Sequence, residues 1–167
     1  MTKKVKAFTL HNNRGQSVLM SQLSGWRDPT DESNDIFGPV VRYSWSVDDF
    51  EFEMRDEENM ISLRELPDSS GFVCFEKPSV PDNFLLLDIY GKKRLRLSVP
   101  WELTKPQNPQ SAKPPTAFVT ISSPYINPAD EKEGEFGITA WVEYAGMYYF
   151  ELDYQRGEFL WGLEIRD

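Results

Sequence analysis

Hydrophobic and polar side chains alternate along several short segments of this chain, most clearly from Asp49 to Arg55. A period of two places successive side chains on opposite faces of a β-strand, one face wet and the other buried. Helical periodicity is weak throughout, whereas β-branched residues are frequent and aromatic residues make up 14% of the chain. The pattern therefore predicts strands and little helix.

Polar turn residues join these segments into hairpins. The run 56–59 separates residues 49–55 from residues 60–66. Matching the apolar faces of the two segments places Phe52 opposite Leu63. We therefore expect these segments to pair with each other.

A second hairpin is predicted from residues 84–90 and 94–99. Matched faces require a three-residue loop at 91–93 and place Leu87 opposite Leu97. A shift of one residue would place Arg94 opposite Ile89 and break every matched pair, so the loop length follows from the pattern.

The C-terminal stretch 136–165 contains two turns, at residues 144–146 and 156–157. Glycine at the end of the first loop suits a left-handed backbone, and matched faces place Ala140 opposite Phe150. We expect three strands in an antiparallel meander.

Further strands are expected on both sides of these hairpins. An N-terminal hairpin turns at residues 13–15 and places Leu10 near Val18. Three short β-rich segments bring the expected total to ten or eleven strands: 40–46, 72–75 and 116–122.

Two long loops interrupt the hairpins, an acidic one at 25–38 and a proline-rich one at 104–115. Proline excludes helix and central strand from the second loop, which we interpret as a crossing between sheets. A chain of 167 residues suffices for one core, so we expect a single β-rich domain over residues 1–167. The predicted fold is all-β, with antiparallel hairpins and a meander of about ten strands, arranged as a barrel or a sandwich.

The same registers predict which side chains are buried. The expected core contains Phe50, Phe52, Leu63, Leu85, Leu87, Leu97, Ala140, Phe150, Leu152, Trp161 and Leu163. Of the tryptophans, Trp45, Trp141 and Trp161 are expected to fill the core, while Trp26 and Trp101 flank loops.

The net charge of −9 is unevenly distributed. Residues 28–68 hold thirteen acidic side chains against three arginines, and residues 114–167 have a net charge of −7. Residues 1–27 and 69–113 are basic, with net charges of +5 and +3. Because nucleic acids and anionic membranes attract clustered lysine and arginine, this acidic balance predicts that neither is a partner.

Few side chains suit catalysis. His11 is the single histidine and Cys74 the single cysteine, so a zinc or iron site with several His ligands is excluded, and a Cys74–His11 dyad is a weak alternative. Glu51 and Glu53 lie about 7 Å apart on one strand face, as any alternate pair does. The acidic loop from Asp28 lacks the spacing of an EF-hand, although an irregular calcium site stays an alternative. We expect no catalytic residues, no metal and no cofactor.

An acidic β-scaffold without catalytic groups is suited to binding a basic protein, because complementary charge speeds association. In size and acidity the chain resembles small single-domain bacterial immunity proteins, which neutralise basic toxin domains such as nucleases, and this resemblance implies an inhibitor. The alternatives are a ligand- or carbohydrate-binding module and an adaptor domain. The lone cysteine and the absence of a visible export signal predict a cytoplasmic protein. The expected contact residues are Trp26, Asp28, Asp31, Glu32, Asp35, Asp49, Glu51, Glu53, Asp56, Glu57 and Glu58.

Overall fold

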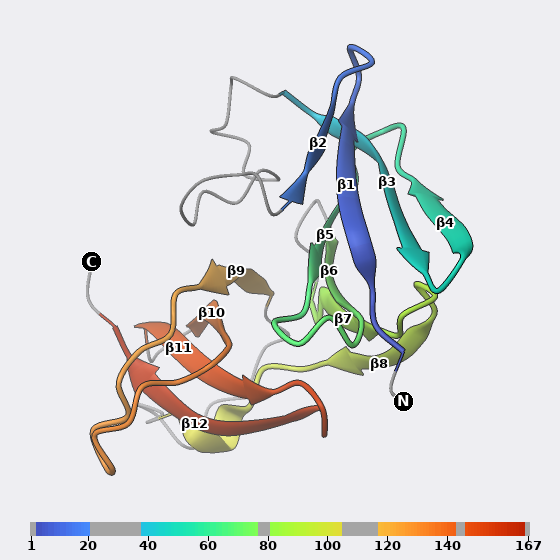
Figure 1. Cartoon of the computed structure of the whole chain (residues 1–167). Helices are drawn as coiled ribbons and strands as arrows, with labels where there is room; N and C mark the ends of the chain where they lie inside the picture. Colours follow the sequence, from blue (N-terminus) through green and yellow to red (C-terminus); the bar gives the residue numbers. More distant parts are fainter. Residues whose placement is uncertain (1–2, 21–37, 77–80, 105–116, 143–145, 166–167) are drawn as a thin grey trace. The chain divides into compact units, whose positions relative to one another are not determined.

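The computed structural model describes residues 3–20, 38–76, 81–104, 117–142 and 146–165 (Figure 1). These residues form twelve strands and one short 3-10 helix, η2 (Trp101–Leu103), which confirms the all-β prediction. The strands are β1 (Lys6–Asn12), β2 (Ser17–Leu19), β3 (Val40–Val47), β4 (Phe50–Arg55), β5 (Ile61–Glu65), β6 (Phe72–Glu76), β7 (Phe84–Leu87), β8 (Lys93–Leu97), β9 (Phe118–Ser122), β10 (Gly137–Val142), β11 (Gly146–Asp153) and β12 (Glu158–Glu164).

The described strands form three antiparallel sheets of four strands each. Their strand orders are β2-β1-β3-β4, β5-β6-β7-β8 and β12-β11-β10-β9, and none of the three closes into a barrel. The chain divides into two compact units, one of residues 1–78 and 85–94 and the other of residues 79–84 and 95–167. That these units fold as one domain stays a prediction.

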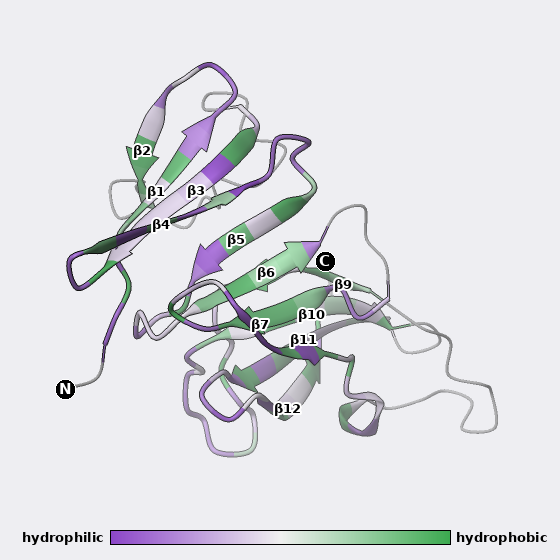
Figure 2. Ribbon diagram, turned by 90° about the vertical axis from the view of Figure 1, so that its right-hand side faces the viewer, coloured by the Kyte–Doolittle hydropathy of each residue, from purple (hydrophilic) through white to green (hydrophobic). Residues whose placement is uncertain are grey.

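In the first unit, side chains of β1 and β3 form one hydrophobic core with side chains of β5, β6 and β7. Every second residue of β3 is buried, including Tyr43 and Trp45, as the alternating pattern requires. These rings meet Phe8 and Phe72, with ring centroids 4.7 Å apart for Trp45 and Phe72. In Figure 2, β6 and β7 are almost continuously hydrophobic, since their side chains contribute to this core.

In the second unit, two buried polar side chains bond to the backbone of neighbouring segments. The amide of Asn83 donates to the carbonyl of Phe118 at 3.1 Å and accepts from its N–H at 2.7 Å, as a paired strand would. The carboxylate of Glu151 accepts from the N–H groups of Glu135 and Phe136 and from the phenol of Tyr149. Both residues are at most 5% exposed, so water seldom competes for these hydrogen bonds.

The predicted pairing of residues 49–55 with 60–66 is wrong. Strand β4 pairs with β3, which places Phe52 opposite Trp45, and β5 pairs with β6 in a different sheet. A two-residue turn at Asp48 and Asp49 closes the β3–β4 hairpin, with a positive φ of 53° at Asp48. A tight turn brings β3 and β4 together with the least loop-closure cost, so the local hairpin forms.

The remaining hairpins are confirmed, with some changes of register. The N-terminal hairpin pairs Leu10 with Val18 as predicted. In the meander, Ala140 pairs with Tyr148 instead of Phe150, a shift of two residues that keeps the same side chains inside. In the β7–β8 hairpin the predicted loop at 91–93 is wrong. Asp88 N–H donates to the Lys92 carbonyl, so the loop comprises residues 89–91 and ends on glycine with a φ of 79°.

Most of the predicted core is buried or half-buried, but two large side chains are not. Phe50 is 71% exposed, although its cross-strand partner Val47 is buried, because it begins the edge strand β4 beside the turn. Trp141 is 58% exposed, because it lies on the opposite face of β10 from the buried Ala140 and Val142. The expectation that Trp141 fills the core is therefore wrong, whereas Trp45 is buried and Trp161 half-buried.

Candidate functional site

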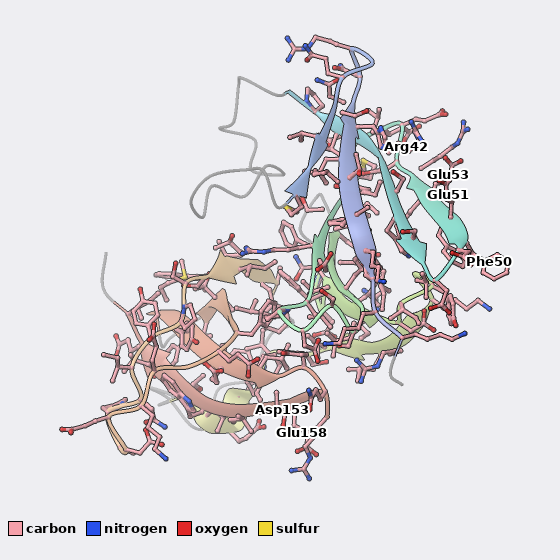
Figure 3. All side chains as sticks on the ribbon, in the orientation of Figure 1. Arg42, Phe50, Glu51, Glu53, Asp153 and Glu158 are labelled. Carbon is pink, nitrogen blue, oxygen red and sulfur yellow. The ribbon has the colours of Figure 1, made fainter. Side chains whose placement is uncertain are left out.

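The outer face of the first sheet presents two exposed carboxylates side by side. Glu51 and Glu53 occupy alternate positions of β4, on the face opposite the half-buried Phe52 and Met54. Figure 3 shows both carboxylates on the same side of the strand, with Arg42 of β3 beside them. The strict alternation from Asp49 to Arg55 therefore produces this face, as predicted from the sequence.

Arginine partners differ between the two carboxylates. Glu53 bonds Arg55 at 3.0 Å and Arg42 at 3.2 Å, and the hydrogen bond from Arg55 is the main reason that the pKa of Glu53 is lowered. Among the described residues, no basic side chain forms an ion pair with Glu51. Glu51 is therefore the carboxylate of this face best able to take a new cationic partner.

A shallow groove of about 440 Å³ runs over this face. Glu51 and Glu53 line it together with Arg42, which pairs with Glu53, and with the hydroxyl groups of Thr9, Ser44 and Ser46. Strand β1 bulges beside the groove, where the register shifts between Lys6 and Thr9 and Ala7 has a positive φ of 54°. The groove thus offers carboxylate and hydroxyl oxygens as acceptors, which suits a donor-rich group such as guanidinium or ammonium.

A histidine-centred network fixes the neighbouring part of the face. His11 Nδ1 lies 3.2 Å from the guanidinium of Arg42 and 2.6 Å from Ser17 Oγ, while Nε2 lies 2.7 Å from Ser44 Oγ. Because arginine can only donate, Nδ1 is an acceptor and the proton is on Nε2, which donates to Ser44. Burial and then the charge of Arg42 lower the pKa of His11, so the imidazole is neutral at pH 7.

This network predicts a stability loss in mild acid. Since the folded pKa of His11 is lower than its usual value of 6.5, the unfolded chain binds a proton first as the pH falls below about 6.5. The contribution of neutral His11 to the free energy of unfolding is therefore fully present at pH 7, and it decreases as the pH falls toward 5. Urea unfolding at several pH values, compared with His11→Gln, should show a smaller decline in the variant. Equal declines would contradict this role for His11.

The tip after β4 contains acids with two different functions. Glu57 and Glu58 are exposed, and Glu57 lies 3.8 Å from the guanidinium of Arg55. Asp56 is only 9% exposed, and its carboxylate accepts from the N–H groups of Met60 and Ile61. We therefore treat Asp56 as the residue that shapes the tip and omit it from the contact surface. Asp49 is exposed at the other end of β4.

The other predicted contact residues lie outside the described residues. They are Trp26, Asp28, Asp31, Glu32 and Asp35, and the alternative calcium loop lies there with them. The structure thus brings together Asp49, Glu51, Glu53, Glu57 and Glu58 around one strand.

No protein-family model matches this chain, and no curated protein matches it. A chain of a solved structure does match, with a TM-score of 0.64 over 97% of this chain and 99% of that one. That structure is described as "Structure of Tne2 in complex with Tni2". The two chains are 10% identical, so the match establishes a shared fold. The fold therefore occurs in a complex of two proteins.

The described residues contain no group of three or more His, Cys, Asp or Glu side chains placed to hold a metal ion. Nor do they include a helix long and apolar enough to span a bilayer. Cys74 is buried in the core of the first unit, whereas both ring nitrogens of His11 bond serines, so the two do not form a dyad.

The groove and the histidine network were not predicted from the sequence. The parity of β1 already places Thr9 and His11 on the face opposite Phe8 and Leu10. Their meeting with Ser44 requires the β1–β3 pairing, which joins segments separated by more than 25 residues. No local turn indicates that pairing, so the sequence alone contains no signal for it.

Proposed function

We propose that this protein binds a basic protein partner through the acidic outer face of β4 and acts as an inhibitor of the immunity type, without catalysis of its own. The observation that carries the proposal is the exposed pair Glu51 and Glu53, of which Glu51 has no ion-pair partner among the described residues. A cationic side chain of the partner can form an ion pair with Glu51 without displacing an arginine.

The surroundings of this pair support the same partner chemistry. Asp49 and Glu57 extend the negative charge to both ends of β4, and the groove adds neutral acceptors between them. A negative field over one face raises the association rate of a positively charged protein. A nuclease toxin has such a charge, because it must attract nucleic acid. The similar fold in the Tne2–Tni2 complex is compatible with a protein-binding role.

The test is partner capture from the native host. We expect wild-type protein to retain one basic protein, and the variant Glu51→Lys, Glu53→Lys, Glu57→Lys to retain it at least tenfold less well. The association rate should fall most at low salt, because exposed charges are screened beyond about 8–10 Å at physiological ionic strength. Surface plasmon resonance with the captured protein would measure both rates.

A matched control has the same change of charge elsewhere. Glu131→Lys, Glu133→Lys and Glu158→Lys replace three exposed acids of the second unit. This control should bind like wild type if the β4 face is the contact. If the two triple variants weaken binding equally, net charge alone governs association and the proposed face is wrong. Circular dichroism of both variants would verify that they fold.

A further inference from the structure

Strand β4 has one edge that no described strand covers. It is the last strand of the sheet β2-β1-β3-β4, and in Figure 1 it lies at the margin of that sheet. The N–H of Asp56 donates to the carbonyl of Val41, and the β3–β4 register continues without a bulge from that point. Hydrogen-bonded and non-bonded pairs alternate in an antiparallel ladder, so Phe50, Phe52 and Met54 bond to β3.

It follows that Glu51, Glu53 and Arg55 direct their backbone N–H and C=O groups away from β3. Two of these three are the residues whose side chains form the acidic face. An exposed edge of this kind is a template for another strand, and charged side chains normally discourage that pairing. Here the charge is mainly of one sign, so it discourages an acidic strand and favours a basic one.

The two faces of β4 specify the added strand further. Opposite Glu51 and Glu53 it would place basic side chains as direct cross-strand neighbours. On the other face, Phe50 is 71% exposed and projects from the sheet in Figure 3, so it offers an aromatic contact to an apolar side chain. Side chains of a strand alternate between these faces, which fixes a period of two in the partner.

We infer that the partner's contact segment is an extended strand with alternating basic and apolar residues, which joins the first sheet by pairing with the free edge of β4. This inference rests on the proposed function and names how the same face recognises its partner. Backbone bonds to Glu51, Glu53 and Arg55 supply part of the affinity, and the alternating side chains supply specificity. Removal of the backbone bonds should therefore weaken binding even when every charge is kept.

The probe is an acetylated, amidated heptapeptide of alternating lysine and valine. Two comparison peptides contain the same numbers of lysine and valine residues. One keeps the alternating order but has N-methyl groups on alternate backbone amides, and the other has its lysines in one block. Fluorescence anisotropy with wild-type protein should show binding at least tenfold weaker for both. In ¹⁵N NMR spectra, the alternating peptide should protect the amides of Glu51, Glu53 and Arg55 from exchange with solvent.

A pair of protein variants tests the same bonds from the other side. Arg55→Pro and Arg55→Ala both remove the guanidinium that contacts Glu53, but only proline also removes an outward N–H. Proline is tolerated on edge strands, so the fold should persist. We expect Arg55→Ala to bind the peptide at least as well as wild type, and Arg55→Pro at least tenfold more weakly than Arg55→Ala.

The outcomes separate this inference from the proposed function. If all three peptides bind wild type equally and lose affinity for the Glu51→Lys, Glu53→Lys, Glu57→Lys variant, the acidic face binds by charge and strand addition is overturned. If no peptide prefers wild type to that variant, strand addition fails, and partner capture then decides the acidic face separately. A concentration-dependent dimer of the free protein in sedimentation, with these amides protected, would assign the edge to a second copy and overturn the inference.

Discussion

Replacing Glu151 with alanine is expected to lower the free energy of unfolding by about 3–5 kcal/mol. The carboxylate is 5% exposed, and it accepts from Glu135 N–H at 2.8 Å, from Phe136 N–H at 3.1 Å and from the phenol of Tyr149. Alanine would leave these donors without a partner in a buried site. Water reaches such a site poorly, so each donor retains most of its desolvation cost.

Glutamine at the same position is the matched control. Its carbonyl oxygen can accept from the two backbone N–H groups, and its amide can donate to the Tyr149 oxygen, so Glu151→Gln should cost about 1 kcal/mol. Urea unfolding followed by circular dichroism would compare the two variants with wild type. A cost for Glu151→Ala no larger than that for Glu151→Gln would show that this network contributes little.

Replacing Trp45 with alanine should also lower the free energy of unfolding by about 3–5 kcal/mol, in this case through a cavity. Trp45 is 3% exposed, and its ring lies 4.7 Å from that of Phe72 and 6.1 Å from that of Phe52. Its indole N–H also donates to the carbonyl of Ile89 at 2.7 Å. The variant would lose these packing contacts and leave that carbonyl without its donor.

Trp45→Phe separates the two contributions, because phenylalanine keeps an aromatic ring but has no N–H. We expect its cost to lie between wild type and Trp45→Ala. Thermal unfolding by calorimetry of Trp45→Ala and Glu151→Ala would also test the single-domain prediction, since the two residues lie in different units. In one cooperative domain both variants shift the same single transition, whereas independent units would give two transitions, each shifted by one variant.

The fold class was predictable because alternation and turn chemistry are local properties of the chain. They identify the strands and decide which face of each strand is wet, as for Glu51 and Glu53. Alternation does not identify the neighbour of a strand. Residues 50–55 have the same pattern whether they pair with β3 or with β5, and the short turn at Asp48 and Asp49 decides in favour of β3.

The prediction of strand register is limited because side chains repeat on the same face every two residues. The shift of two residues between β10 and β11 leaves every side chain on its predicted face, so matching faces cannot detect it. Position in the sheet matters too, because Phe50 has inward parity but lies on the edge strand β4, beside the turn. For the candidate site, parity predicted the acidic strand face, whereas the groove depends on β1 lying beside β3, a contact between distant segments.

The route of the chain through its two units constrains how the gene can change. Residues 79–84 belong to the second unit, yet they are encoded before residues 85–94, which complete the first. Neither unit corresponds to one uninterrupted stretch of codons, so a single crossover cannot exchange either unit whole. A crossover that replaced residues 95–167 would leave Asn83 facing a foreign strand in place of Phe118, its bonding partner 35 positions downstream. The codons for Asn83 and Phe118 must therefore be inherited together if the bonds between these two residues are to be kept.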